Sequence, residues 1–280
     1  MIPKRIFFYW GGEKMSWMRY MTLYSFRKFN PDWEMVLYLS NNNNTKSWNG
    51  PEEQDFSNYR GDNYLDKISD LNIEIKNVEF PENVKDLIKD LSPIHESDLF
   101  RYYELFRNGG LYCDMDVLFF RPIDEFYGKI KDYDSLIHQD KYNITIGFLG
   151  SCVNNLFYKN IFSCGIFNNK TDNYQSLGVD LIYKIYGGNR IDSQIYDKIL
   201  NRFRNLKFYN LDTNLIYKYD WTKIDYNFSN PVGIGGFSDD SIGYHWYGGS
   251  PISQKYNNLL NETNYMDFKT TFSELCKNIM

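Results

Sequence analysis

The 280-residue sequence contains no alanine, three histidines, and four cysteines that form no C-x-x-C pair. Without such a pair, we expect the cysteines to be small buried apolar residues. No apolar run approaches the roughly 18 to 20 residues that span a bilayer, so we predict no transmembrane segment. The run Ile6 to Trp10 is also too short for the core of a signal peptide. We therefore expect a cytoplasmic protein.

Positive charge does not dominate the sequence: 31 Lys and Arg face 36 Asp and Glu, for a net charge of −5. This balance lacks the basic surface that nucleic-acid binding requires, so we expect no nucleic-acid partner. The chain is rich in aromatics, with 25 Tyr, 21 Phe and 6 Trp. An AT-rich genome, bacterial or viral, explains this richness together with the missing alanine, so we do not take it as evidence of function.

Strands and helices alternate in the first half of the chain. Apolar patterns predict strands at 4–9, 34–39, 73–80 and 111–113, and helices at 15–29, 81–91 and 97–107, with a polar loop at 41–62. Such alternation is typical of an α/β fold with a parallel sheet. The second half is more mixed, with strands predicted at 135–138, 144–149, 207–209 and 242–246, and helices at 172–186, 191–203 and from 265 onward. No repeat or long linker divides the chain, which predicts one domain over 1–280.

The most informative segment runs from Ser97 to Asp116. Asp98 and Arg101 are three residues apart and share one face of a predicted helix. Two glycines then turn the chain into a short strand, and Asp114 and Asp116 follow at its carboxyl end. Because side chains alternate along a strand, these two carboxylates can point the same way. Ligands bind at this end of α/β sheets, and paired carboxylates suit Mg²⁺ or Mn²⁺ with a diphosphate completing the coordination.

These residues carry a resemblance to a known family. Ser97 to Asp116, together with Ile6 to Gly12, resembles the glycosyltransferases with a DXD-containing sugar-binding region. The family includes the initiating α-mannosyltransferases of yeast, bacterial capsular enzymes and the catalytic domains of large clostridial glucosylating toxins. The resemblance is fainter near Gly178, where Val179 stands in place of the family's usual Pro. It returns at Tyr244 to Ser250, similar to a closing segment in which a His-Trp pair precedes a Ser-Trp pair, with Pro251 replacing the last Trp.

The resemblance implies a GT-A-like, Rossmann-like fold with a mostly parallel central sheet. It also implies a retaining, divalent-metal-dependent enzyme that moves a hexose from a nucleotide sugar to a glycan, lipid-linked or protein acceptor. UDP-hexose is the favoured donor and GDP-mannose the second. About 1–125 would bind the nucleotide sugar and metal, and about 126–280 would hold the acceptor and a C-terminal clasp. Such an enzyme would build a polysaccharide in a bacterial or virus-infected cytoplasm, or act in a host cytoplasm.

The resemblance also assigns roles to single residues. For the nucleotide sugar, it implies that Trp10 stacks on the base beside Gly11, that Asp98 and Arg101 hold the sugar, that Asp114 lies near the ribose, and that Ser250 closes over the diphosphate. For the metal, it implies a site formed by Asp114, Asp116 and His245, with Asp116 as the direct ligand and His245 binding the metal or the diphosphate. Asp98, Arg101 and Asp116 would be the catalytic residues, because a carboxylate near the developing cationic sugar and a metal at the leaving group both lower the barrier.

Two other interpretations remain open. Asp114-Met-Asp116-Val117 also satisfies the first motif of haloacid-dehalogenase-like phosphatases, although about 110 residues of organised chain precede it here, where that motif usually lies on an early strand. A non-catalytic carbohydrate-binding protein would account for the aromatics but not for the acidic pair or for Asp98 and Arg101. Metal-dependent hydrolysis of a sugar nucleotide distinguishes a transferase from both.

Overall fold

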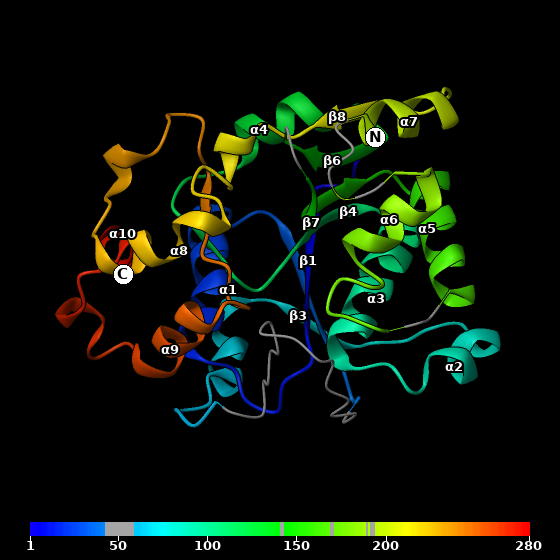
Figure 1. Ribbon diagram of the computed structural model, residues 1–280. Helices are drawn as coiled ribbons and strands as arrows, with labels where there is room; N and C mark the ends of the chain where they lie inside the picture. Colours follow the sequence, from blue (N-terminus) through cyan, green and yellow to red (C-terminus); the bar gives the residue numbers. More distant parts are fainter. Residues whose placement is uncertain (43–58, 141–142, 169–170, 189, 191–193) are drawn as a thin grey trace.

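The centre of the fold is a seven-stranded sheet with the order β3-β2-β1-β4-β7-β6-β8. The computed structural model describes residues 1–42, 59–140, 143–168, 171–188, 190 and 194–280, and Figure 1 shows its arrangement. The strands are β1 Arg5–Trp10, β2 Glu34–Leu39, β3 Glu74–Asn77, β4 Gly110–Cys113, β6 Ser135–Gln139, β7 Ile144–Ser151 and β8 Phe208–Asn210. Only β7 runs against its neighbours, β4 and β6, among the described strands of this sheet. The predicted α/β fold with a mostly parallel sheet is therefore confirmed.

A second, two-stranded sheet pairs β5 Val117–Phe119 with β9 Gly243–His245 in antiparallel fashion. The α-helices are α1 Trp17–Phe29, α2 Glu82–Ile88, α3 Pro93–Arg107, α4 Asp124–Ile130, α5 Leu156–Phe167, α6 Val179–Tyr186, α7 Ile195–Arg202, α8 Ile224–Ser229, α9 Pro251–Leu259 and α10 Thr271–Ile279. Short 3-10 helices are η2 Leu65–Leu71, η3 Thr213–Leu215, η4 Trp221–Lys223, η5 Ile234–Gly236 and η6 Tyr265–Asp267. Within the described part of the chain, every helix is too short or too polar to cross a bilayer.

Alternating side chains of β1 divide the core into two layers. Phe7 and Tyr9 join a cluster with α3, α5 and α6, whereas Ile6, Phe8 and Trp10 join a cluster on the opposite face with α1 and α4. A third cluster packs α1 against α8, α10 and β9. Figure 1 shows this division, with α3, α5 and α6 on one side of the sheet and α1 with α8 to α10 on the other. The C-terminal third of the chain thus packs against α1, which lies near the start of the chain.

Several predicted boundaries need correction. The helix predicted at 97–107 begins at Pro93, because the Ser92 hydroxyl accepts from the His95 N–H and a proline suits the first helical position. The helix predicted at 172–186 begins only at Val179, after Gly178. The C-terminal α-helix begins at Thr271 rather than at 265. Strand β5 and helices α4, α5, α8 and α9 were not predicted. Of the predicted loop 41–62 and helix 191–203, residues 43–58 and 191–193 lie outside the described residues.

The cysteines follow the prediction only in part. Cys113 and Cys276 are buried, but Cys152 and Cys164 are half-buried, and all four are free thiols. The expectation of four buried cysteines is therefore wrong for two of them, because Cys152 lies in the turn after β7 and Cys164 on the partly covered side of α5.

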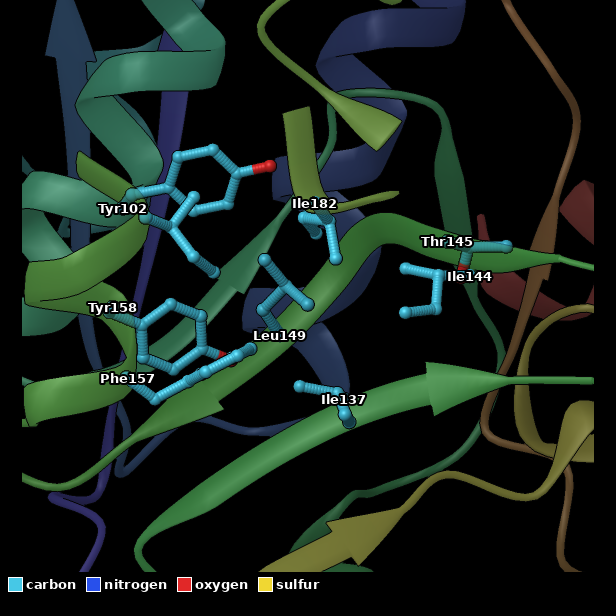
Figure 2. A pocket seen from close by; sticks show the side chains of 9 residues that line it. Tyr102, Ile137, Ile144, Thr145, Leu149, Phe157, Tyr158 and Ile182 are labelled. Atoms are coloured by element: carbon cyan, nitrogen blue, oxygen red, sulfur yellow. The ribbon is translucent and has the colours of Figure 1, made fainter. Parts of the chain in front are cut away.

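A small apolar cavity lies between β6, β7, α5 and α6 (Figure 2). Its volume is about 10 Å³, and it is lined by Tyr102, Ile137, Ile144, Thr145, Leu149, Phe157, Tyr158, Ile161 and Ile182. A cavity needs roughly 10–15 Å³ and several polar partners to hold one water. Since the lining is almost wholly apolar, this space is a packing defect and not a sugar-binding pocket.

A buried ion pair joins β1 to α3 at the end of the sheet away from the acidic motif. Arg5 Nη1 lies 2.9 Å from Glu104 Oε1, and the Tyr38 hydroxyl donates to the same oxygen at 2.6 Å. We expect Glu104→Ala to lower the free energy of unfolding by about 3 kcal/mol, because the buried Arg5 charge loses its buried partner and keeps only the exposed Glu34, at 3.2 Å. Urea denaturation measures this loss. Glu82→Ala, which breaks the exposed pair with Lys85, should cost less than about 1 kcal/mol, and an equal loss in both variants would contradict the expectation.

Candidate functional site

Three potential metal ligands converge where β4 ends. Asp114 and Asp116 follow β4, and His245 ends β9; each offers a ligand atom, and these atoms all lie within 4.8 Å of one another. The β5–β9 pairing brings them together, with Val117 opposite His245 in the register. The Trp246 N–H donates to the Asp116 carbonyl at 2.9 Å and completes this join. Residues about 130 positions apart in the chain thus form one cluster.

The two carboxylate oxygens of the buried Asp116 differ in their contacts with the described residues. Its Oδ2 accepts from the Gly248 N–H at 2.7 Å and lies 3.8 Å from Arg19 Nη1. Its Oδ1 faces His245 Nε2 at 3.2 Å and, in the described part of the chain, makes no hydrogen bond of standard geometry. Burial acts to raise the pKa of this carboxyl, but His245, Arg19 and the Gly248 N–H together hold it well below its usual range. Asp116 is therefore a carboxylate whose Oδ1 is available to a ligand.

Asp98, Arg101 and Asp114 form a second, adjoining group. Arg101 Nη2 lies 3.0 Å from Asp98 Oδ1, and Arg101 Nη1 lies 3.2 Å from Asp114 Oδ1. The Tyr112 hydroxyl donates to the same Asp114 oxygen at 2.5 Å. Burial raises the pKa of Asp98 to about 7, even though Arg101 acts to lower it. The predicted sharing of one helix face by Asp98 and Arg101 is thus realised, and Arg101 bridges that face to the acidic pair.

The cluster fits a divalent cation. Two ligands at right angles on an ion at 2.0–2.1 Å lie about 2.9 Å apart, close to the 3.2 Å between Asp116 Oδ1 and His245 Nε2. Carboxylates suit Mg²⁺ and Mn²⁺, and the added imidazole extends the range toward other first-row metals. Asp116 Oδ1, buried without a hydrogen bond of its own in the described residues, is the atom such an ion would satisfy.

The structure does not bring every predicted residue into this cluster. The Trp10 side chain is buried at the end of β1, with the Arg19 guanidinium carbon 5.9 Å from its ring centroid. Gly11 lies where α3 approaches β1, and a Cβ there would come within 2.8 Å of Pro93 Cβ. The Ser250 hydroxyl accepts from the Ser253 N–H at 3.1 Å and caps α9. Their roles toward a nucleotide stay predictions.

Sequence reasoning missed Arg19, Gly147 and Tyr247. Arg19 is a buried residue of α1 whose guanidinium carbon lies 4.7 Å from the Trp246 ring centroid, and nothing in the sequence around it suggested a site. Gly147 lies inside β7, and a Cβ there would come within 2.8 Å of Asp114 Oδ2 and 3.4 Å of His245 Nε2. A glycine within a strand often marks a close approach, so this signal was available. Tyr247 has a φ of 50°, which no sequence pattern announced.

His138 is an ordinary buried residue of β6, and the Tyr217 ring lies between it and His245 in a series of ring contacts. Its two ring nitrogens lie 2.9 and 3.0 Å from the hydroxyls of Thr145 and Thr213, and its ring packs on Tyr217. Burial lowers the pKa of His138 to about 4.

The unfolded chain takes up a proton near pH 6.5, before folded His138 does, so this group destabilises the fold as the pH falls from about 6.5 toward 4. We expect wild type to lose about 2–3 kcal/mol more than His138→Gln over this range. Urea denaturation at pH 7 and pH 4.5 measures the difference, and equal losses would contradict it.

One comparison with known proteins covers the segment that carries most of the residues of this candidate site. A family model described as "Glycosyltransferase sugar-binding region containing DXD motif" matches residues 15–142, slightly less than half of the chain. The match spans Asp98, Arg101 and the acidic pair, whereas His245 lies outside it. The class defined by this match is that of the glycosyltransferases. Residues 15–142 resemble the DXD-containing sugar-binding family, which confirms the predicted resemblance and the predicted enzyme class.

Solved glycosyltransferases have similar overall arrangements, at low identity. PaToxG glycosyltransferase is 16% identical, with 72% of this chain and 75% of that chain covered and a TM-score of 0.47. GlyE of Streptococcus pneumoniae TIGR4 is 13% identical over 87% and 55% of the two chains, with a TM-score of 0.43. Mouse xyloside xylosyltransferase 1 is 10% identical over 88% and 98%, with a TM-score of 0.43. No curated protein matches the sequence. Because these TM-scores lie below 0.5, we draw function from the family match and from the site's own residues.

Proposed function

We propose that this protein is a retaining, divalent-metal-dependent glycosyltransferase with a GT-A-like fold. It transfers a hexose from a nucleotide sugar, UDP-hexose before GDP-mannose, to a glycan, lipid-linked or protein acceptor. The observation that carries the proposal is the cluster of Asp114, Asp116 and His245, whose ligand atoms lie within 4.8 Å of one another beside the buried Asp98–Arg101 pair. The first two ligands and that pair lie within the segment that matches the sugar-binding family.

Asp114, Asp116 and His245 would hold Mn²⁺ or Mg²⁺. When bound, such a cation supplies Lewis-acid stabilisation of the negative charge that develops on a diphosphate leaving group. The chain contributes charge of its own here. Arg19 and Arg101 place two guanidinium groups beside the carboxylates of Asp98, Asp114 and Asp116. The charges of these side chains thereby nearly cancel, so they would not repel a diphosphate bound together with a cation.

Asp98 and Arg101 would hold the transferred sugar. Both side chains are 6% exposed, so their hydrogen bonds to hydroxyl groups would form away from bulk water, where such bonds are stronger. Ionised Asp98 also places negative charge near a sugar that becomes cationic as its bond to the diphosphate breaks. The pKa of about 7 ties this role to pH, because the carboxylate forms only as the pH rises through that value.

The remaining predicted roles are part of the same proposal. Trp10 and Gly11 would face the base at the carboxyl end of β1, and Ser250 would lie near the diphosphate at the start of α9. About 1–125 would bind donor and metal, and about 126–280 would provide the acceptor side and the clasp, all within one domain. We place the enzyme in polysaccharide biosynthesis in a bacterial or virus-infected cytoplasm.

The geometry favours a transferase over a phosphatase. In the phosphatase interpretation, Asp114 would be the nucleophile. Here Arg101 joins Asp114 Oδ1 to Asp98, and the Tyr112 hydroxyl donates to the same Asp114 oxygen. Asp114 is therefore built into a polar network and is better placed to hold a ligand than to attack one.

A donor panel tests the proposed function. Thermal shift and hydrolysis are measured for UDP- and GDP-sugars with and without Mn²⁺. We expect one donor to raise the Tm and to be hydrolysed only when metal is present. Cleavage of phosphate esters with Mg²⁺, without nucleotide-sugar binding, would overturn the transferase in favour of the phosphatase. Stabilisation by free sugars alone, independent of metal, would instead indicate a carbohydrate-binding protein.

A further inference from the structure

Among the residues that the structure describes, His245 has no contact of the kind that usually orients a metal-binding histidine. A ligating imidazole normally donates its second ring N–H to an acceptor, and this bond fixes the ring. Here Nε2 faces Asp116 at 3.2 Å, whereas Nδ1 is buried and has no hydrogen-bond partner among the described residues. The orientation of the ring must therefore come from packing.

Two tyrosine rings supply that packing. The Tyr247 ring meets the imidazole edge to face, with centroids 4.2 Å apart and an interplanar angle of 74°. The buried Tyr217 ring lies 5.2 Å from it at 50°, and Tyr217 in turn packs against His138. Edge-to-face contacts of this kind have a preferred geometry and are more than simple filling of space. His245 is thus held between rings and not by a hydrogen bond.

The backbone of Tyr247 is strained. Its φ of 50° lies in the left-handed region, which is unfavourable for a bulky residue and which glycine adopts freely. This turn directs two backbone N–H groups to Asp116. The Trp246 N–H donates to the Asp116 carbonyl, and the Gly248 N–H donates to Asp116 Oδ2. A glycine at 247 would form this turn with less strain, so the turn alone does not account for a tyrosine there.

We propose that Tyr247 is a positioning residue whose ring holds the His245 imidazole in its metal-binding orientation, in place of the absent hydrogen bond at Nδ1. The inference rests on the proposed metal site. It assigns no chemical step to the tyrosine, and the phenol hydroxyl has no part in it.

The test compares Tyr247→Gly, which keeps the turn and removes the ring, with Tyr247→Phe, which keeps the ring. Mn²⁺ binding is measured without donor by the EPR signal of free Mn²⁺, and pulsed EPR of the bound ion detects nitrogen coupling from His245. We expect Tyr247→Gly to bind Mn²⁺ about tenfold more weakly and to lose most of the nitrogen coupling. Tyr247→Phe should bind like wild type.

Asn154→Gly is the matched control, since Asn154 is also left-handed, at φ 61°, in the turn before α5. It should bind Mn²⁺ like wild type. Wild-type affinity and nitrogen coupling in Tyr247→Gly would overturn the role of Tyr247 while leaving the proposed function intact. Absence of Mn²⁺ binding by wild type would instead remove the metal from the proposed function, and this inference with it.

Discussion

An Asp116→Asn variant should lose metal-dependent donor hydrolysis, with kcat/KM falling by about a hundredfold to a thousandfold. The amide can still accept from the Gly248 N–H, so the local backbone is retained. It removes the negative charge that faces His245 at 3.2 Å, and with it the atom best placed to bind a cation. Hydrolysis kinetics with Mn²⁺, together with the Tm shift that Mn²⁺ and a nucleoside diphosphate produce, measure the loss.

Asp240→Asn is the control for this variant, because Asp240 is 76% exposed and pairs only loosely with Lys129 at 3.4 Å. It removes the same charge from the surface and should behave as wild type. Full Mn²⁺-dependent hydrolysis by Asp116→Asn would show that the acidic pair is not the metal site, and the proposed chemistry would then fail at its central residue.

A single methyl group at position 147 should have the second large effect. The added Cβ of Gly147→Ala would lie 2.8 Å from Asp114 Oδ2, 3.1 Å from the Tyr217 hydroxyl and 3.4 Å from His245 Nε2. Since Asp114 is also held by Arg101, it cannot move away without disturbing that pair. We expect Mn²⁺ affinity to fall about tenfold and kcat/KM by about a hundredfold, as small misplacements of reacting groups typically do.

Gly128→Ala provides a matched comparison within α4, where an added Cβ meets nothing within 4 Å. Because alanine is favoured over glycine in a helix, this variant should be more stable by up to about 1 kcal/mol, with unchanged activity. Isothermal titration with Mn²⁺ and hydrolysis rates test both variants. If Gly147→Ala bound Mn²⁺ as tightly as Gly128→Ala, the close approach of β7 to the acidic pair would have no functional meaning.

Local sequence was sufficient for the elements whose pattern is strong. The aromatic run of β1 alternates between two apolar layers, and the alternation of strands and helices up to β4 predicted the parallel sheet that the structure contains. The prediction of elements from the sequence failed where the local pattern is weak or misleading. Helix α5 has apolar residues around most of its surface and therefore shows little helical periodicity, and the first turn of α3 depends on a cap at Ser92.

The sequence alone indicated the resemblance to the family and predicted the nearby half of the candidate site. Asp98, Arg101, Asp114 and Asp116 lie within 19 consecutive residues, so their proximity follows from one helix, one turn and one strand. A motif also identified His245, but its side chain comes close to Asp116 only because β5 pairs with β9. Arg19, Gly147 and Tyr247 join the site only through tertiary packing. Their roles depend on contacts between segments far apart in the chain. The glycine within β7 indicated a close approach, but no pattern in a single sequence shows which segments meet there.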